Sequence, residues 1–353
     1  MWRKIIIFFV NTQYLHNELL QWYESHRRDL PWRDTTDPYA IWISEIILQQ
    51  TRVAQGLDYY LRFMSRFPTI ADLAQADEQE VLLFWQGLGY YSRARNLHAA
   101  AKQIMESYNG VFPTEYSQVR SLRGVGDYTS AAICSFAYNA PYAVVDGNVY
   151  RVLSRLLDDE TPIDTTIGKR RFQQLADRLL DKNEPRLYNQ AVMELGALCC
   201  IPQTPHCEEC PLRQLCMAYA HQTAVLLPVK SKTKTIRERY FTHLIYINSQ
   251  SQTLLQRREE KDIWHHLYQF PLVESDHLLG TEEVENEYLK ENEQLVKEVE
   301  LIHVLTHQRI NARFFVIKSF SLPKWNGSSV VSLSNIHDYP LSRLTLRAMQ
   351  LLE

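Results

Sequence analysis

Four cysteines in one short stretch constrain the fold of this chain more than any other feature of its sequence. They are Cys200, Cys207, Cys210 and Cys216, with the spacing C-x6-C-x2-C-x5-C. Four thiolates can hold a [4Fe–4S] cluster, and they can also hold a tetrahedral zinc ion, although zinc sites usually pair two short C-x2-C knuckles across a longer loop. The spacing therefore predicts a metal site in a reducing compartment and favours iron–sulfur over zinc. Cys134 and Cys199 lie outside this spacing, and we expect them to be small buried residues.

The chain is long enough for two domains, and its texture changes along its length. At 353 residues it exceeds one typical domain. From Tyr14 to about Ala220, apolar residues recur at intervals of three and four, which predicts a mainly helical region. The segment 229–235 is polar and basic without an apolar face, so we interpret it as a linker; a strand edge with solvated lysines is the alternative.

The region after the linker is predicted to be α+β. Two short alternating segments separated by a turn indicate a hairpin, and a third strand and two helices follow. The expected elements are strand 240–247, turn 248–251, its hairpin partner 253–257, a charged helix 282–295, strand 313–317 and a closing helix 341–352.

A net charge of -3 gives no general attraction for a polyanion, so any nucleic-acid site must come from local geometry. The segment Leu122-Arg123-Gly124-Val125-Gly126 joins two helical stretches. Two glycines allow a tight turn with exposed N–H groups, and the following helix N-terminus adds partial positive charge. Such a hairpin can bind a DNA phosphate without a basic residue, although a plain helix–helix turn would have the same sequence.

Two carboxylates are candidates for catalysis. Glu45 lies in a helix that is apolar nearly all round, and burial there would raise its pKa, as a general acid requires. The alternative is a solvated stripe of Glu45, Gln49 and Arg52. Asp146 precedes a helix, where it could simply be an N-cap, but capping bonds would also keep it ionised as a stabiliser of a cation. Cleaving a glycosidic bond uses such a pair, an acid for the leaving group and a carboxylate beside the developing cation.

Several motifs resemble the MutY family of adenine DNA glycosylases, within the helix–hairpin–helix, iron–sulfur superfamily that includes endonuclease III. The resemblance covers nearly the whole helical region, and the cysteine spacing matches the cluster loop of that superfamily. The motifs are Leu30-Pro31-Trp32-Arg33, Ser44-Glu45-Ile46-Ile47-Leu48-Gln49-Gln50-Thr51, Gly87-Leu88-Gly89-Tyr90-Tyr91-Ser92-Arg93-Ala94-Arg95-Asn96-Leu97 and Val145-Asp146-Gly147-Asn148-Val149. In the hairpin, Arg123 replaces the proline of the usual L-P-G-V-G.

The resemblance implies an architecture. A six-helix barrel module (32–140) and an iron–sulfur cluster module (1–31 plus 141–228) would form the catalytic region, followed by a linker (229–238) and a Nudix-like domain (239–353). The [4Fe–4S] cluster would be the cofactor, and double-stranded DNA with an A:8-oxoguanine or A:G mispair the partner.

The resemblance also implies roles for individual residues. Glu45 takes the proton-donor position and Asp146 the cation-stabilising position, with Asn148 and Tyr128 in the catalytic set. The extruded base would contact Arg28, Trp32, Leu48 and Val53, and the duplex would be filled by Gln50, Thr51 and Leu88. Gly124, Val125 and Gly126 would contact the DNA backbone.

Two features indicate which reaction is expected. Lyase-competent relatives carry a lysine nucleophile at the position of Tyr128, and tyrosine cannot form a Schiff base, so a monofunctional glycosylase is expected. The segment 263–271 resembles W-x-x-L-W/Y-x-F-P of the MutY C-terminal domain, and the sequence has no Nudix metal box. His303-Val304-Leu305-Thr306-His307 aligns with the family's F-S-H loop, so Thr306 and His307 are expected to read 8-oxoguanine; a plain strand end is the alternative.

Two rival functions remain, an endonuclease III-like pyrimidine glycosylase–lyase and a non-catalytic DNA-binding relative. Tyr128 and the second domain argue against the first, and the presence of both carboxylates argues against the second. The apolar start, residues 1–10, is short for a signal peptide and no small-residue cleavage site follows it. No window of the sequence is apolar enough to span a bilayer. We therefore expect a monomeric, soluble, cytoplasmic protein.

Overall fold

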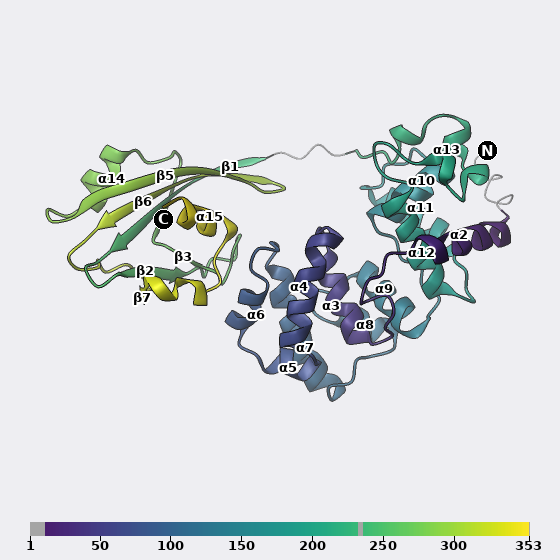
Figure 1. The fold of residues 1–353 in the computed structure, drawn as a ribbon, viewed down its shortest axis with the longest axis horizontal. Coiled ribbons are helices and arrows are strands. Elements are labelled where there is room, and N and C mark those ends of the chain that lie inside the picture. The colour runs from purple at the N-terminus through teal and green to yellow at the C-terminus, as the bar shows by residue number, and fades with distance from the viewer. Residues whose placement is uncertain (1–10, 232–235, 353) are drawn as a thin grey trace. The chain divides into compact units, whose positions relative to one another are not determined.

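The computed structural model describes residues 11–231 and 236–352, and Figure 1 shows their elements. The chain divides into two units, residues 1–64 with 102–233, and residues 65–101 with 234–353. Helices α4 (Val53–Arg66) and α7 (Ser92–Tyr108) each cross this division. Among the described residues, no helix has the length and apolar character that a membrane crossing requires. The expected start at residues 1–10 and residues 232–235 of the expected linker lie outside the described residues.

The first unit is helical, as predicted, and its described part contains no strand. Its elements are α2 (Thr12–His26), α3 (Pro38–Leu48), most of α4, the end of α7, α8 (Tyr116–Ser121), α9 (Asp127–Tyr138), α10 (Gly147–Leu156), α11 (Thr166–Leu179), α12 (Pro185–Leu198), η1 (Cys207–Glu209), η2 (Arg213–Leu215), α13 (Met217–Ala220) and η3 (Ala224–Leu226).

Two sets of helix contacts build this unit. Helix α12 packs against α2, α9 and α10, and α3 packs against α9. The apolar faces of α2, α10, α11 and α12 meet in one core, in which Leu19 and Phe172 are fully buried. Gly196 on α12 permits the close approach of α10, because a Cβ there would lie 2.6 Å from the Cβ of Asn148. This packing fixes the N-terminal end of α10, which carries Asp146.

The second unit combines α5 (Ile70–Gln75), α6 (Glu78–Phe84) and most of α7 with two sheets and two further helices. The four-stranded sheet has the order β4-β1-β6-β5 and the three-stranded sheet the order β3-β2-β7. Strands β1 and β6 are parallel, and the other pairs are antiparallel. The remaining elements are β1 (Arg237–Ile247), β2 (Gln252–Arg257), β3 (Tyr268–Gln269), β4 (Leu272–Ser275), α14 (Thr281–Tyr288), β5 (Gln294–Val304), β6 (Gln308–Lys318), β7 (Ser328–Ser332), η4 (Leu333–Asp338) and α15 (Arg343–Leu352).

The four-stranded sheet is buried on both faces, which explains the apolar character of β6. Phe314 points into a core shared with β2, β7 and α15. Phe315 points into a second core that includes Val284 of α14. Figure 1 shows α14 and α15 beside this sheet. The α+β class predicted from the sequence is correct.

Two sequence-based predictions in this unit are wrong. The turn at 248–251 is present, but β2 does not pair with β1. Both edges of β1 are occupied, by β4 and β6, so β2 joins the other sheet. The predicted helix 282–295 ends at Tyr288, and β5 begins at Gln294. The many charged residues of β5 obscure its strand character, although its buried Leu301 and half-buried Val299 alternate with exposed residues.

Candidate active site

A cavity of about 330 Å³ in the first unit brings together residues from segments far apart in the sequence. Helix α3 contributes Glu45, the N-terminal turn of α9 contributes Tyr128, and the start of α10 contributes Asp146 and Asn148. All the predicted catalytic residues therefore line one cavity. The predicted base and duplex contacts that line it too are Arg28, Trp32, Leu48, Gln50, Thr51 and Val53.

Glu45 is buried, which excludes the solvated-stripe alternative. The residues of α3 from Tyr39 to Ile47 are all buried, so the carboxyl has little access to water. This desolvation raises the pKa of Glu45 to about 7, and the negative charge of Asp146 adds to the effect. A hydrogen bond from Tyr128 and the charge of Arg33 act in the opposite direction. Glu45 can therefore carry a proton near neutral pH, as a general acid does.

Asp146 is the N-cap of α10, and its position also faces the cavity. Its Oδ1 accepts the Val149 amide at 2.8 Å, and its Oδ2 accepts the side-chain amide of Asn148 at 2.8 Å. Burial raises the pKa of Asp146 although these bonds lower it. The expectation that capping bonds alone keep this carboxylate ionised thus underestimates desolvation. Arg151 binds the other end of the Asn148 amide at 2.9 Å and holds its orientation.

The sequence did not reveal Glu194, a fully buried carboxylate at the wall of the same cavity. Arg28 binds it with two guanidinium hydrogen bonds of 2.9 and 2.6 Å, and Arg33 adds one of 2.5 Å. Burial alone would raise the pKa of Glu194, but these bonds outweigh it and hold the pKa below its usual range. Arg28, predicted as a base contact, is therefore held in an ion pair at the cavity wall.

Gln50 has a strained backbone at the mouth of the cavity. Its φ is 58°, in the left-handed region that residues other than glycine rarely adopt. Gln50 is exposed and lies in the turn that follows α3, where the Thr51 amide donates to the carbonyl of Leu48. Such strain is common where a side chain is positioned for binding.

The glycine hairpin links α8 to α9, as predicted. Gly124 has a φ of 75°, and Gly126 is the N-cap of α9, with open space where a Cβ would stand. The side chain of Val125 is buried and its amide donates to the Leu122 carbonyl. Neither group is therefore available for the DNA contact that the resemblance implied for this residue. Arg123, Gly124 and Asp127 are exposed and Gly126 is half-buried, so these residues are the accessible part of the hairpin.

The four spaced cysteines line a small cavity of about 30 Å³ together with Arg155. Cys200 follows α12, Cys207 begins η1, Cys210 ends it and Cys216 follows η2. The Arg155 guanidinium donates to the Cys200 sulfur at 3.3 Å and to the carbonyls of Ile201 and Pro202. A buried cation beside convergent thiols suits a site for thiolate ligands. Cys199 also borders this cavity, and Cys134 is buried in α9 as expected.

A second cavity, of about 540 Å³, lies in the second unit. Thr306 and His307 line it from the turn between β5 and β6, together with Trp264 and Leu88. The Thr306 and Tyr90 hydroxyls are 2.6 Å apart. Leu88, which was expected to act with Gln50 and Thr51, lines this cavity and is not on the wall of the first.

Comparisons with known proteins identify the family of each part of the chain. Residues 43–177 match the model of the HhH-GPD superfamily of base excision DNA repair proteins, and residues 242–351 match that of the NUDIX domain. In solved structures, a thermostable thymine-DNA glycosylase is 28% identical with a TM-score of 0.53, covering 62% of this chain and 97% of its own. An endonuclease III–DNA complex at 22% identity and a TM-score of 0.51, covering 61% of this chain and 99% of its own, shares the fold.

Curated relatives extend the likeness over most of the chain. The adenine DNA glycosylase of Mus musculus is 44% identical over 58% of this chain, which spans only 41% of that relative. The adenine DNA glycosylases of two Buchnera aphidicola subspecies are closer in length to this chain. One, from Buchnera aphidicola subsp. Baizongia pistaciae, is 30% identical over 91% of both chains. The other, from Buchnera aphidicola subsp. Schizaphis graminum, is 36% identical over 74% of this chain and 75% of its own. The chain therefore belongs to the adenine DNA glycosylase family of base excision repair enzymes.

Proposed function

We propose that this chain hydrolyses the N-glycosidic bond of adenine mispaired with 8-oxoguanine or guanine in double-stranded DNA. The observation that carries the proposal is a protonatable carboxyl, Glu45, and a second carboxylate, Asp146, on the wall of one cavity. An adenine inside a duplex cannot reach such a cavity, so the nucleotide must be extruded first.

In the proposed reaction, Glu45 donates a proton to the adenine as the bond to the sugar breaks. Protonation makes adenine a better leaving group, and the sugar develops positive charge. Asp146, oriented by Val149 and Asn148, stabilises that charge. Water then attacks the sugar and gives its proton to the carboxylate that Glu45 has become. Glu194, Arg28 and Arg33 supply donors and acceptors at the cavity wall that could hold the polar edge of the base.

The enzyme would act without a lyase step. Tyr128 occupies the position at which lyase-competent relatives carry lysine, and burial raises the pKa of its hydroxyl well above the usual value. A neutral phenol hydrogen-bonded to Glu45 is no amine nucleophile for the sugar. This argues against the endonuclease III-like alternative.

The DNA backbone would be held by Gly124, Gly126 and the N-terminal turn of α9. Backbone N–H groups at a helix N-terminus attract phosphate without a basic side chain. Gln50 and Thr51, on the turn that follows α3, would fill the space left by the extruded nucleotide. The expected catalytic region, 1–228, would carry out base excision. The expected domain 239–353 would read the opposite base through Thr306 and His307.

The residues around Cys200 fit a [4Fe–4S] cluster, which Cys200, Cys207, Cys210 and Cys216 would hold. The cluster would supply structural support to its loop, and no step of the reaction requires electron transfer. Anaerobically purified protein should contain about four irons per chain, measured by metal analysis. Stoichiometric zinc together with an absence of iron in the same sample would replace the cluster with a zinc site.

The proposed function is tested with a duplex that contains one A:8-oxoguanine pair. Strand breaks should appear only after alkali treatment, and borohydride should trap no enzyme–DNA adduct. A duplex with thymine glycol opposite adenine tests the endonuclease III-like alternative. Asp146→Asn should lose activity severely while still binding the duplex. Binding without adenine release by the unaltered chain would support the non-catalytic alternative.

A further inference from the structure

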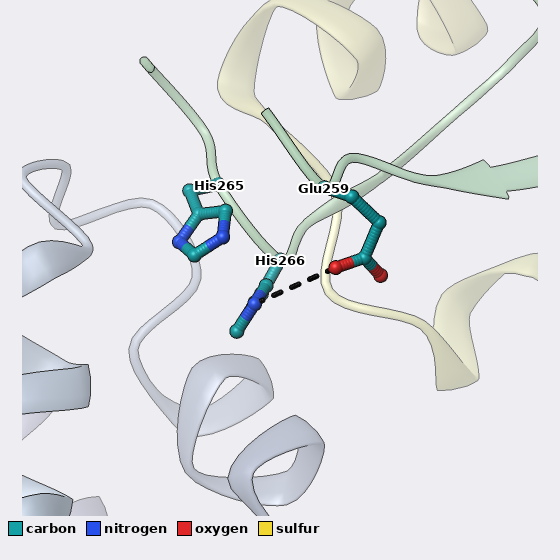
Figure 2. A group of neighbouring side chains, drawn as sticks. All are labelled: Glu259, His265 and His266. Atoms are coloured by element: carbon teal, nitrogen blue, oxygen red, sulfur yellow. Dashed lines mark ion pairs between the residues drawn. The ribbon is translucent and has the colours of Figure 1, made fainter. Parts of the chain in front are cut away.

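A second cluster of chemically reactive side chains lies in the second unit, in the loop between β2 and β3. It consists of Glu259, His265 and His266, whose potential ligand atoms all lie within 4.8 Å of one another. Figure 2 shows the three side chains facing one another, with Glu259 opposite the ring of His266. None of them has a part in the proposed base excision reaction.

The geometry around His266 selects which of its ring nitrogens is available. Its Nδ1 lies 2.5 Å from Oε1 of Glu78, at the start of α6. A carboxylate can only accept, so in the neutral ring Nδ1 carries the proton and Nε2 presents a lone pair. That Nε2 lies 3.7 Å from Oε2 of Glu259. Metal-binding histidines commonly have this arrangement, in which a carboxylate accepts from one nitrogen and the metal takes the other.

We propose that Glu259, His265 and His266 bind a Zn²⁺ ion, with water as the fourth ligand and Glu78 as the carboxylate that orients His266. Two nitrogens and one carboxylate oxygen are a ligand set that zinc prefers. Ligands about 2.1 Å from tetrahedral zinc are about 3.4 Å apart. A small side-chain rotation therefore brings Nε2 and Oε2 from 3.7 Å to that separation.

The neighbouring cations leave the ligand oxygen accessible. Arg257 lies 3.6 Å from Oε1 of Glu259, the oxygen that does not face His266, and 3.3 Å from Glu78. Arg95 donates to the backbone carbonyl of His265 at 2.7 Å and not to its ring. These contacts fix the loop and neutralise the surplus carboxylate charge without occupying Oε2 of Glu259.

The loop backbone holds the rings together at a conformational cost. His266 has a φ of 68° and Trp264 one of 58°, both in the left-handed region. The His265 and His266 rings are 3.7 Å apart between centroids. Two protonated imidazoles would repel at this distance, whereas two neutral ones can share a cation. A bound ion would thus tie the loop to α6 through His266 and Glu78.

The test measures zinc bound by the intact full chain in equilibrium dialysis, with iron measured in the same samples. One zinc per chain should bind to this site. Glu259→Gln and His265→Ala should each weaken binding at least tenfold. Glu78→Gln keeps an acceptor for Nδ1 but loses its charge, and should weaken binding about 10- to 100-fold. Every variant retains the four cysteines, so zinc bound there is equal in all samples and cancels.

The matched control is His277→Ala, which removes an exposed histidine that also lies beside two carboxylates in the same unit. It should bind zinc like the unaltered chain. Cu²⁺ in place of zinc provides a spectroscopic readout, with coupling to two ring nitrogens in the unaltered chain and to one in His265→Ala. Glu259 is exposed, so its variant should fold, and circular dichroism checks this. Equal zinc binding in the unaltered chain and in Glu259→Gln and His265→Ala would overturn the proposal.

Discussion

The hydroxyl of Tyr128 donates a hydrogen bond of 2.8 Å to Oε2 of Glu45, and so joins the helix that follows the glycine hairpin to the buried carboxyl. The bond favours the ionised form of Glu45 and opposes the larger effect of burial. Tyr128 therefore sets how far the pKa of Glu45 rises.

Tyr128→Phe should change the pH dependence of adenine release. If protonated Glu45 is the active form, the single-turnover rate falls as pH rises through its pKa, near 7 in the free protein. Removing the hydroxyl removes a contact that lowers this pKa, so the alkaline limb of the profile should move to higher pH. Single-turnover rates between pH 5.5 and 9 provide the measurement. A limb that moves to lower pH would contradict the assigned role of the hydrogen bond.

Glu45→Gln should abolish adenine release and leave binding to the mispair largely intact. Glutamine keeps the shape of the side chain and removes the transferable proton, so the loss belongs to the chemical step. Single-turnover rates and duplex affinities separate the two effects. Glu80→Gln is a suitable control, because this carboxylate forms an exposed pair with Arg66. A near-normal rate in Glu45→Gln would mean that Glu45 does not donate the proton and has only a structural role.

The same variant should be more stable than the unaltered chain at alkaline pH. The folded-state pKa of Glu45 is about 7 and lies above its ordinary value of 4.5. The folded state therefore loses stability as pH rises between these values, by an amount on the order of 3 kcal/mol. Glu45→Gln has no such loss, so its advantage in free energy of unfolding should grow from pH 5 to pH 8. Denaturant titrations at both pH values measure it, and a constant difference would show that Glu45 is not desolvated.

The two carboxylates proposed for catalysis and the cysteine cluster could be singled out from the sequence because each lies in a local pattern, and the family resemblance chose among the alternatives that the pattern left open. Glu45 is surrounded by apolar helix positions, Asp146 precedes a helix start, and the cysteines lie within one loop. Glu194 has no such signature, because its partners Arg28 and Arg33 lie more than 150 residues earlier and meet it only in the folded chain. Strand pairing was mispredicted for a similar reason. The turn at 248–251 is local, but β4 and β6 occupy the edges of β1 through tertiary contacts.

Glu194→Gln should destabilise the fold at neutral pH. The change leaves Arg28 and Arg33 without their buried counter-charge, and breaking such a pair costs about 3 kcal/mol, less to the extent that Arg28 is exposed. The pKa of Glu194 is lowered in the folded state, so its contribution is lost as pH falls through that pKa. The difference between variant and unaltered chain should therefore shrink in acid. Glu80→Gln, at an exposed pair, should cost under about 1 kcal/mol. Equal losses at the two positions would contradict the buried role of Glu194.

Substitutions in the turn between β5 and β6 can test the proposed reading of 8-oxoguanine separately from catalysis. Thr306 and His307 line the cavity of the second unit, and the Thr306 hydroxyl lies 2.6 Å from that of Tyr90. These polar groups can recognise atoms that distinguish 8-oxoguanine from guanine. Losing one or two such hydrogen bonds costs about 1–3 kcal/mol, which corresponds to roughly fivefold to 150-fold.

The double substitution of Thr306 and His307 by alanine should therefore slow or weaken action on A:8-oxoguanine by that factor and affect A:G far less. Glu45 and Asp146 are unchanged, so basal adenine release should persist. The control substitutes His277 and Thr281, an exposed histidine and a half-buried threonine of the same unit, and should leave both mispairs unaffected. Single-turnover rates and affinities for the two mispairs decide the matter. An equal loss on both would mean that this turn serves general DNA binding or stability, because a group that reads only the added atoms of 8-oxoguanine has nothing to lose on guanine.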